Sequence, residues 1–208
     1  MSWFRRAPLA EARWIVIDCE TSGLDPKRDR LLSVGAVSVR GRRLALAEAY
    51  GAVIAQAQPS APENIVIHGI GGEAQRSGRA AGEVLRELGA FTAGGIPVAF
   101  HAPFDAEILR RACKSADAPA LPRRWLDLAQ LAPALFAGRQ PGRGELDDWL
   151  ARFGIAPQAR HDALGDAFAA AQLLLALLDE AARQGLDSAE DVTALAAAGR
   201  WLGSPARG

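Results

Sequence analysis

Hydrophobic residues form short continuous runs in the first quarter of the chain and recur at helical spacing afterwards. Runs rich in Val, Leu and Ile, bounded by turn residues, predict strands over residues 14–19, 31–39, 44–54, 96–100 and 125–127. Apolar spacings of three and four predict helices over residues 83–91, 103–112, 128–136, 146–153, 162–183 and 188–198. Residues 65–70 are interpreted as a short apolar connector. Strands first, then alternating helices and strands, predict an α/β fold whose mixed sheet carries helices on both faces.

The length of 208 residues suits one domain with small appendages. We expect an N-terminal arm over residues 1–13, a main domain over 14–184, and a C-terminal helix and tail over 185–208 that pack on the same domain. No run of 18 uncharged apolar residues occurs, so we expect no membrane span. The first residues lack the apolar region of a signal peptide. With Cys19 and Cys113 as its only cysteines, the chain is expected to carry free thiols in a reducing cytoplasm.

The charges balance, with 24 basic and 24 acidic residues, which excludes a strongly basic nucleic-acid binder. They do not exclude an enzyme that holds nucleic acid locally, through metal ions and a few arginines. Nearly all the basic residues are Arg, and only Lys27 and Lys114 are Lys. Arg139 and Arg143 lie in a glycine-rich loop, where contact with a phosphate backbone competes with the plainer interpretation of a solvated loop.

Two acids follow the first predicted strand with one residue between them. Side chains alternate faces along a strand, so Asp18 and Glu20 point the same way, about 7 Å apart. Adjacent carboxylates at the end of a buried strand repel, so a cation must neutralise them or one must stay protonated. Oxygen ligands of this kind suit Mg²⁺ or Mn²⁺. The alternative is that both acids merely begin a solvated turn.

Further candidate groups lie at the starts of two predicted helices. Asp105 falls in the first turn of a helix, where the helix dipole favours an acid whatever its function. Asp162 suits an N-cap of the longest helix. Asp166 lies one turn further on an otherwise apolar helix, which argues against a purely solvated role, and His161 stands at the helix edge.

These residues resemble the three motifs of the DEDDh family of 3′–5′ exonucleases, the group of the proofreading epsilon subunit of bacterial DNA polymerase III. The motifs are Asp18-x-Glu20-Thr21, then Phe104-Asp105, then His161 followed five residues later by Asp166. The stretches 24–26, 33–37 and 67–70 are also similar to stretches typical of the group. The resemblance implies a ribonuclease-H-like fold with a five-stranded mixed sheet in which the second strand is antiparallel.

The same resemblance implies roles for individual residues. Two divalent cations, Mg²⁺ or Mn²⁺, would be held by Asp18, Glu20, Asp105 and Asp166, with Asp18 shared between them. His161 would act as the general base, and nucleoside 5′-monophosphates would leave a 3′ end. The family positions that contact the terminal nucleotide correspond to Thr21, Leu24 and Phe104. For Phe104 a place in the hydrophobic core is an equal alternative, and for Leu24 an exposed loop position is the plainer one.

Two departures from the family pattern concern neighbours of the site. His101 replaces an amide-bearing residue, and Ser33 stands where many members have Glu. We expect His101 to play a structural or supporting role rather than to bind metal, and His68 to be structural.

The sequence therefore predicts a metal-dependent exonuclease acting on single-stranded nucleic acid 3′ ends, with DNA favoured. We expect it to stand alone or to associate loosely, and association with a DNA polymerase is the partnership considered. Trimming of RNA is an alternative within the same class, because discrimination at the 2′-OH depends on pocket shape. A binding module that has lost turnover is a second alternative. A phosphatase with an aspartyl nucleophile is a third, disfavoured by Glu20 and by the helix that carries His161 and Asp166.

Overall fold

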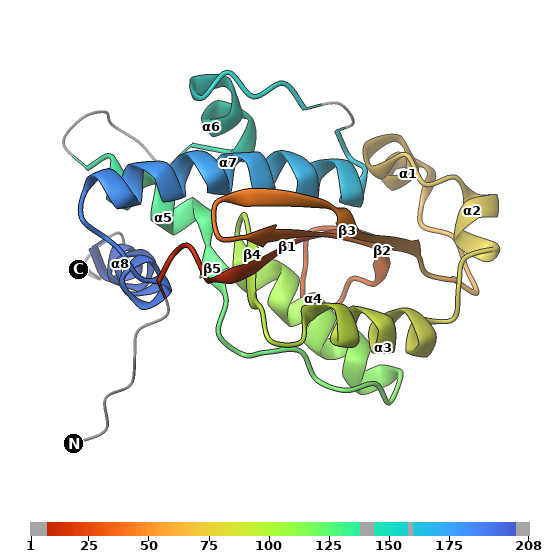
Figure 1. Cartoon of the computed structure of the whole chain (residues 1–208). Helices are drawn as coiled ribbons and strands as arrows, with labels where there is room; N and C mark the ends of the chain where they lie inside the picture. Colours follow the sequence, from red (N-terminus) through yellow and green to blue (C-terminus); the bar gives the residue numbers. More distant parts are fainter. Residues whose placement is uncertain (1–7, 138–143, 158–159, 203–208) are drawn as a thin grey trace, which may run out of the picture.

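The computed structural model describes residues 8–137, 144–157 and 160–202. Five strands form one sheet in the order β3-β2-β1-β4-β5 (Figure 1). Their bounds are β1 (Arg13–Thr21), β2 (Leu31–Arg40), β3 (Arg43–Val53), β4 (Ile96–Ala99) and β5 (Leu126–Asp127). The pairs β1–β2 and β2–β3 are antiparallel, whereas β4 is parallel to β1 and β5 is parallel to β4. The expected five-stranded mixed sheet with an antiparallel second strand is confirmed.

The first strand is longer than its apolar run. Backbone pairing with β2 continues beyond Cys19 through Glu20, opposite Ser33, and after a register shift reaches Thr21, opposite Leu31. Both acids of the first motif are therefore part of the strand, not of the turn that follows it.

Helices cover both faces of the sheet, as the sequence predicted (Figure 1). One face carries α7 (Ala163–Arg183), against which α6 (Leu146–Arg152) and α5 (Leu128–Leu135) pack, and α8 (Ala189–Leu202) packs on α5. The other face carries α3 (Ala81–Thr92) and α4 (Ala102–Ser115). No helix in the described ranges has the length and apolar character needed to cross a bilayer.

The interpretation of residues 65–70 as a plain connector is wrong. Residues in this region form α1 (Pro62–His68), and α2 (Gly72–Arg76) follows it. Pro62 opens α1 at a position where its missing N–H is harmless, and Gly69 ends it in the left-handed conformation at φ 68°. Both helices are too short to show a helical apolar pattern, and local caps and polar contacts define them instead.

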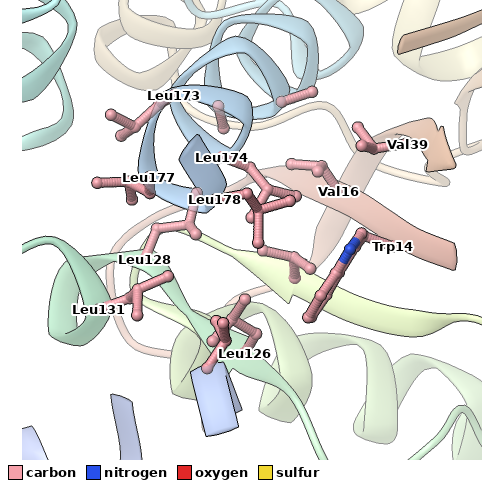
Figure 2. Close-up of a cluster of buried hydrophobic side chains, with 14 of the residues drawn as sticks. Trp14, Val16, Val39, Leu126, Leu128, Leu131, Leu173, Leu174, Leu177 and Leu178 are labelled. Carbon is pink, nitrogen blue, oxygen red and sulfur yellow. The ribbon is translucent and has the colours of Figure 1, made fainter. Parts of the chain in front are cut away.

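Alternation along β1 divides the buried apolar side chains into two cores. Trp14 and Val16 point to the α7 side, where they meet Leu174 and Leu178 (Figure 2). Ile15 and Ile17 point to the opposite side, into the layer beneath α3 and α4. Because β1 is buried on both faces, its sequence is continuously apolar and not alternating.

Part of the expected N-terminal arm is described, and it packs on the main domain. Leu9 is buried in the α7-side core, and its N–H donates to the carbonyl of Asp187 at 3.0 Å. Pro8 and Leu9 of the expected arm thus pair with the segment leading into α8. Residues 1–7 and 203–208 lie outside the described part of the chain, as do Arg139 and Arg143, and the boundaries at 13 and 184 stay a prediction.

A glycine pair lets the start of α7 rest on the sheet. Gly35 of β2 lies opposite Asp18 of β1 on one side and Gly51 of β3 on the other. A Cβ atom at Gly35 would lie 2.2 Å from the carbonyl oxygen of Ala163, the first residue of α7. At Gly51 it would lie 3.4 Å from a side-chain atom of Leu164. The backbone of α7 therefore contacts the sheet next to Asp18 only because Gly35 has no side chain.

We predict that Gly35→Ala lowers the free energy of unfolding by about 1–3 kcal/mol, because a helix backbone must move to admit the methyl group. Gly51→Ala, the matched control, meets only a movable side chain and should change it by less than about 1 kcal/mol. Urea unfolding followed by circular dichroism measures both. Equal effects of the two substitutions would contradict the packing described here.

Candidate active site

The carboxyl end of β1 directs acids to one face and a thiol to the other. Asp18 and Glu20 continue the face of Trp14 and Val16, so they lie on the α7 side of the sheet. Cys19 continues the face of Ile15 and Ile17 and packs against the core on the α4 side. This confirms the prediction that the two acids share a face, and it places both of them on the side of the sheet that α7 covers.

Asp166 joins Asp18 and Glu20 from the first turn of α7. Carboxylate oxygens of the three residues all lie within 4.8 Å of one another, a spacing at which one metal ion can contact all three. Asp166 is buried and accepts a hydrogen bond from the backbone N–H of His161 at 3.0 Å. The N-terminus of α7 is capped by Asp162, whose carboxylate accepts from the N–H of Gly165 at 2.8 Å, as predicted.

Asp105 approaches Asp18 from the opposite face of the sheet. It is buried in the first turn of α4, after Pro103, and the Cys19 thiol donates a hydrogen bond to its carboxylate. Asp105 is not one of the three residues grouped within 4.8 Å, yet its charge acts on Asp18 more strongly than those of Asp166 and Glu20. Asp18 therefore stands between the carboxylates of the α7 face and the single carboxylate of the α4 face.

The crowded acids hold protons more tightly than isolated ones. Burial raises the pKa of Asp18 well above its usual value, and the charges of Asp105, Asp166 and Glu20 raise it further. Burial, together with the charges of Asp166 and Asp162, raises the pKa of Glu20 to about 7. Burial also raises the pKa of Asp105 to about 7, although the hydrogen bond from Cys19 opposes this shift. Clustered carboxylates that favour protonation are the donor set that a hard divalent cation would relieve, so the residues fit Mg²⁺ or Mn²⁺.

A cation of the chain faces this cluster, and the sequence reasoning missed it. Arg160 pairs with the Asp166 carboxylate, and its Nε lies 2.8 Å from a carboxylate oxygen of Asp147 on α6. Its charge lowers the pKa of both Asp18 and Glu20. Arg160 precedes His161 directly, and this adjacency to a motif residue was the only signal in the sequence.

His161 lies at the rim of the cluster. Its side chain is exposed, and its backbone adopts a left-handed conformation at φ 61° that a non-glycine residue rarely adopts. The hydrogen bond from its N–H to Asp166 holds the backbone in this conformation. The role of its imidazole as a general base stays a prediction.

The three expected substrate contacts have different surroundings. The hydroxyl of Thr21 donates to the carbonyl of Gly23 at 2.6 Å, at the end of β1. Leu24 is 92% exposed, in the loop after β1. Phe104 is half-buried against the α4-side core next to Asp105, so its ring is partly a core residue and partly accessible. No described contact tests their roles toward a substrate.

Asp127 is a buried acid beside the site that the sequence reasoning did not single out. One of its carboxylate oxygens accepts the N–H of Ala129, which caps α5, and the N–H of His101, each at 3.1 Å. The second of these bonds holds His101 at φ 65°, directly before α4 and Asp105. The only signal for this acid in the sequence was its place between a short strand and a helix.

Both other histidines have surroundings that agree with supporting roles. The exposed ring of His101 lies 3.6 Å from a carboxylate oxygen of Glu145, which precedes α6. His68 is buried: its Nδ1 accepts the N–H of Ile70 at 3.0 Å, and its Nε2 lies 2.9 Å from the Ser60 hydroxyl. With Nδ1 accepting, Nε2 carries the proton and donates to Ser60, so the ring is neutral; burial lowers its pKa accordingly.

Comparison with known proteins identifies the class to which this fold and this site belong. The RNase_T family model, described as exonuclease, matches residues 15–174. This match spans most of the chain, and it includes all four acids and His161. The chain belongs to this exonuclease family, and its sheet is the ribonuclease-H-like sheet expected from the resemblance to DEDDh exonucleases.

Individual proteins agree with this assignment. A DNA polymerase III subunit epsilon-like protein of Rhodobacter capsulatus is 35% identical over 187 residues, which cover 86% of this chain and 25% of that protein. The chain thus spans about a quarter of that relative's length. E. coli exonuclease I in complex with a dT13 oligonucleotide matches with a TM-score of 0.71 at 18% identity, over 84% of this chain and 42% of that chain. The nuclease domain of 3′hExo, a DEDDh family member bound to rAMP, matches with a TM-score of 0.70 at 14% identity. The match covers 83% of this chain and 94% of that chain. At these identities, the two structures show a shared fold.

We predict that the metal-free protein becomes less stable as the pH rises from 5 to 8. Glu20 and Asp105 keep their protons up to about pH 7 when folded, whereas carboxyls in the unfolded chain lose theirs near pH 4. The folded state binds more protons in this window, so the free energy of unfolding falls with rising pH. The urea midpoint in EDTA should therefore be lower at pH 8 than at pH 6, and Mn²⁺ should raise it at pH 8.

Glu20→Gln should reduce this pH dependence, and Glu11→Gln, which changes an exposed carboxyl, should leave it intact. A midpoint in EDTA that does not change with pH, or that changes equally in both variants, would be inconsistent with the clustering of these acids.

Proposed function

We propose that this chain is a metal-dependent 3′–5′ exonuclease that releases nucleoside 5′-monophosphates from the 3′ ends of single-stranded DNA. The observation that supports this most directly is the meeting of Asp18, Glu20 and Asp166 within 4.8 Å, with Asp105 acting on Asp18 from the other face. Acids from separate parts of the sequence, near residues 18–20, 105 and 166, thus act on one another at the end of β1, in a chain that belongs to an exonuclease family.

In this proposal the acids divide between two ions. Asp18, Glu20 and Asp166 would hold the first, and Asp18 together with Asp105 would hold the second. When bound, two such divalent ions supply positive charge that stabilises the attacking and leaving oxygens of a phosphodiester during in-line displacement. Asp18 would be the shared ligand, because the charges of Asp105, Asp166 and Glu20 all act on its carboxyl group.

Other residues of the chain bind and orient the substrate and move its protons. His161, exposed at the rim, takes the proton of the attacking water as the general base, a role that histidine fills more often than any other residue. Phe104 stacks on the terminal base or sugar, which is tolerant of sequence. Thr21 and the exposed Leu24 contact the same nucleotide from the end of β1 and the following loop.

DNA is proposed over RNA because the relative from Rhodobacter capsulatus carries the name of a DNA polymerase III subunit. E. coli exonuclease I, which shares the fold, was solved with a dT13 oligonucleotide. The name of the Rhodobacter capsulatus relative also supports the proposal that this chain associates with a DNA polymerase. The rAMP bound to 3′hExo shows that a nuclease domain of this fold also accepts a ribonucleotide, so the choice of sugar needs a direct test.

We predict that Asp18→Ala abolishes and His161→Ala strongly reduces the release of mononucleotides from a 5′-labelled oligonucleotide, and that the two variants differ in metal binding. Asp18→Ala removes the shared ligand, so Mn²⁺ binding measured by calorimetry should be lost. His161→Ala should keep Mn²⁺ binding and lower kcat by about 100- to 10,000-fold, as expected when a general base is removed. Glu190→Ala, an exposed acid on α8, is the control and should behave as the unmodified chain.

Full activity in both variants would refute the proposed site. Mn²⁺ that fails to bind the unmodified chain would favour a module that keeps the fold without turnover.

We predict that a single-stranded DNA 12-mer is degraded faster than the RNA 12-mer of the same sequence, with 5′-monophosphates as products in both cases. Initial rates in matched buffers with Mg²⁺, resolved on a denaturing gel, measure the ratio. A ratio that favours RNA would make the chain an RNA-trimming enzyme with the same site. The Asp18→Ala variant, run in parallel, excludes a contaminating nuclease.

A further inference from the structure

A cavity of about 830 Å³ lies on the α4 side of the molecule, outside the group of acids. Its walls come from the loop after β1, from β2 and the segment after β3, from the start of α3, and from the outer part of α4. The floor includes apolar residues such as Leu31, Ile54 and Ile108. None of the proposed ligands or the general base lines it.

The cavity concentrates positive charge in a chain that has none in excess. Five basic and two acidic side chains line it, whereas the whole chain has 24 of each. The acidic pair is Asp29 and Glu107. Both lysines of the chain, Lys27 and Lys114, are among the basic residues, and the others are Arg30, Arg110 and Arg111. An anionic ligand is the chemistry that this lining favours.

Three of these cations already have partners that build the walls. Arg111 donates to the carbonyls of Pro26 and Asp29 at 2.8 and 2.9 Å and so ties the loop to α4. Arg110 forms a two-pronged pair with Glu107, with both N–O distances at 2.7 Å. Arg30 donates to the carbonyl of Gln58 at 2.7 Å.

The ammonium groups of Lys27 and Lys114 differ from these arginines. Both side chains are exposed, and among the described residues neither ammonium forms an ion pair within 4.0 Å or a hydrogen bond, although the charge of Lys27 helps to lower the pKa of Glu107. A compact ammonium on a flexible stem acts as a point charge for a phosphate. The two lysines are therefore the cations available to a ligand entering from solvent.

The cavity and the acids share their supporting elements. The loop that carries Lys27 begins directly after Thr21, and Asp29 accepts the Ser22 hydroxyl at 2.9 Å inside that loop. Helix α4 carries Asp105 in its first turn and Lys114 nine residues later, about 14 Å along the helix axis. A strand whose 3′ end lies at the acids can reach the cavity within a few nucleotides.

We infer that this basic cavity binds the phosphodiester backbone of the nucleic-acid substrate away from the nucleotide that is cleaved. It would raise the affinity for longer strands without taking part in the chemical step. The inference rests on the proposed function, because it assumes a nucleic-acid substrate at the neighbouring acids. Backbone phosphates reach the cavity either from the strand being degraded or from its complement in a duplex.

The test compares the double reversal Lys27→Glu/Lys114→Glu with two matched variants. Arg43→Glu/Arg124→Glu makes the same change in net charge at exposed positions at the other end of the sheet. Lys27→Arg/Lys114→Arg keeps both positive charges. Each variant is assayed on a DNA dinucleotide, a single-stranded 12-mer, and a 12-base-pair duplex with a two-nucleotide 3′ overhang.

For the double reversal we expect kcat to be unchanged on all substrates and KM to be unchanged for the dinucleotide. The KM for the 12-mer should rise about ten-fold, because two of its phosphates no longer meet a cation. The dependence of log(kcat/KM) on log salt should become shallower by about 0.7 for each phosphate of a single strand that is no longer neutralised. The Arg variant and the distant reversal should match the unmodified chain. An effect confined to the duplex would assign the cavity to the complementary strand.

Equal KM values for the double reversal and the distant reversal on the 12-mer and on the duplex would overturn the inference. Anisotropy of a fluorescent 12-mer in EDTA separates this result from a failure of the proposed function. If no substrate is degraded but binding still depends on the two lysines, the proposed function fails and the cavity stands. If degradation occurs and binding ignores the lysines, the cavity fails alone.

Discussion

Repulsion among carboxylates at the carboxyl end of β1 is the constraint around which the rest of the structure is arranged. Burial raises the pKa of Asp18, Glu20 and Asp105, and neighbouring carboxylates raise each of them further, so in the absence of a counter-charge the arrangement opposes folding at neutral pH. Two apolar cores, one on each side of β1, supply the compensating stability. Arg160 relieves the repulsion electrostatically, and it does so at the α7 face, where it pairs with Asp166. A divalent cation bound by all three clustered carboxylates would relieve it far more completely.

The two-fold period of a strand explains why the four acids are not equivalent. Asp18 and Glu20 face α7, while Cys19 faces α4 and donates its thiol proton to a hydrogen bond with Asp105. The site is therefore assembled at the end of the sheet from residues of both helix layers. Asp18 is the acid whose pKa is raised by carboxylates of both layers. The close approach of α7 depends on Gly35, which lies opposite Asp18 and has no side chain to hold the helix away. The position of Asp166 therefore depends on the absence of a side chain at Gly35 as well as on the hydrogen bonds and ion pair of Asp166 itself.

Local patterns were enough to predict the strands, the longer helices, the shared face of Asp18 and Glu20, and the cap at Asp162, because each depends on residues a few positions apart. The five-stranded mixed sheet with its antiparallel second strand was predicted from the resemblance to DEDDh exonucleases. They failed for α1 and α2, which are too short for periodicity and rely on Pro62, Gly69 and the buried His68. They also failed for Arg160, which pairs with Asp147 on α6. They failed as well for Asp127, whose carboxylate accepts the N–H of His101, 26 residues earlier in the chain. Which separated residues meet is decided by the order of the strands and the packing of helices on them, and no single stretch of sequence carries that information.

Net charge was a poor guide for the same reason. A balance of 24 against 24 charged residues excludes a uniformly basic surface. Interactions between exposed charges are screened beyond about 8 Å in physiological salt, however, so the local distribution of charge matters more than its sum. Here the acids collect at the end of β1, while both lysines line a separate cavity along α4. Helix α4 joins the two, with Asp105 at its start, Lys114 near its end, and Arg111 tying it to the loop between them. A polyanion held at such a neighbouring patch would be oriented towards the acids, because the same rigid helix fixes both places.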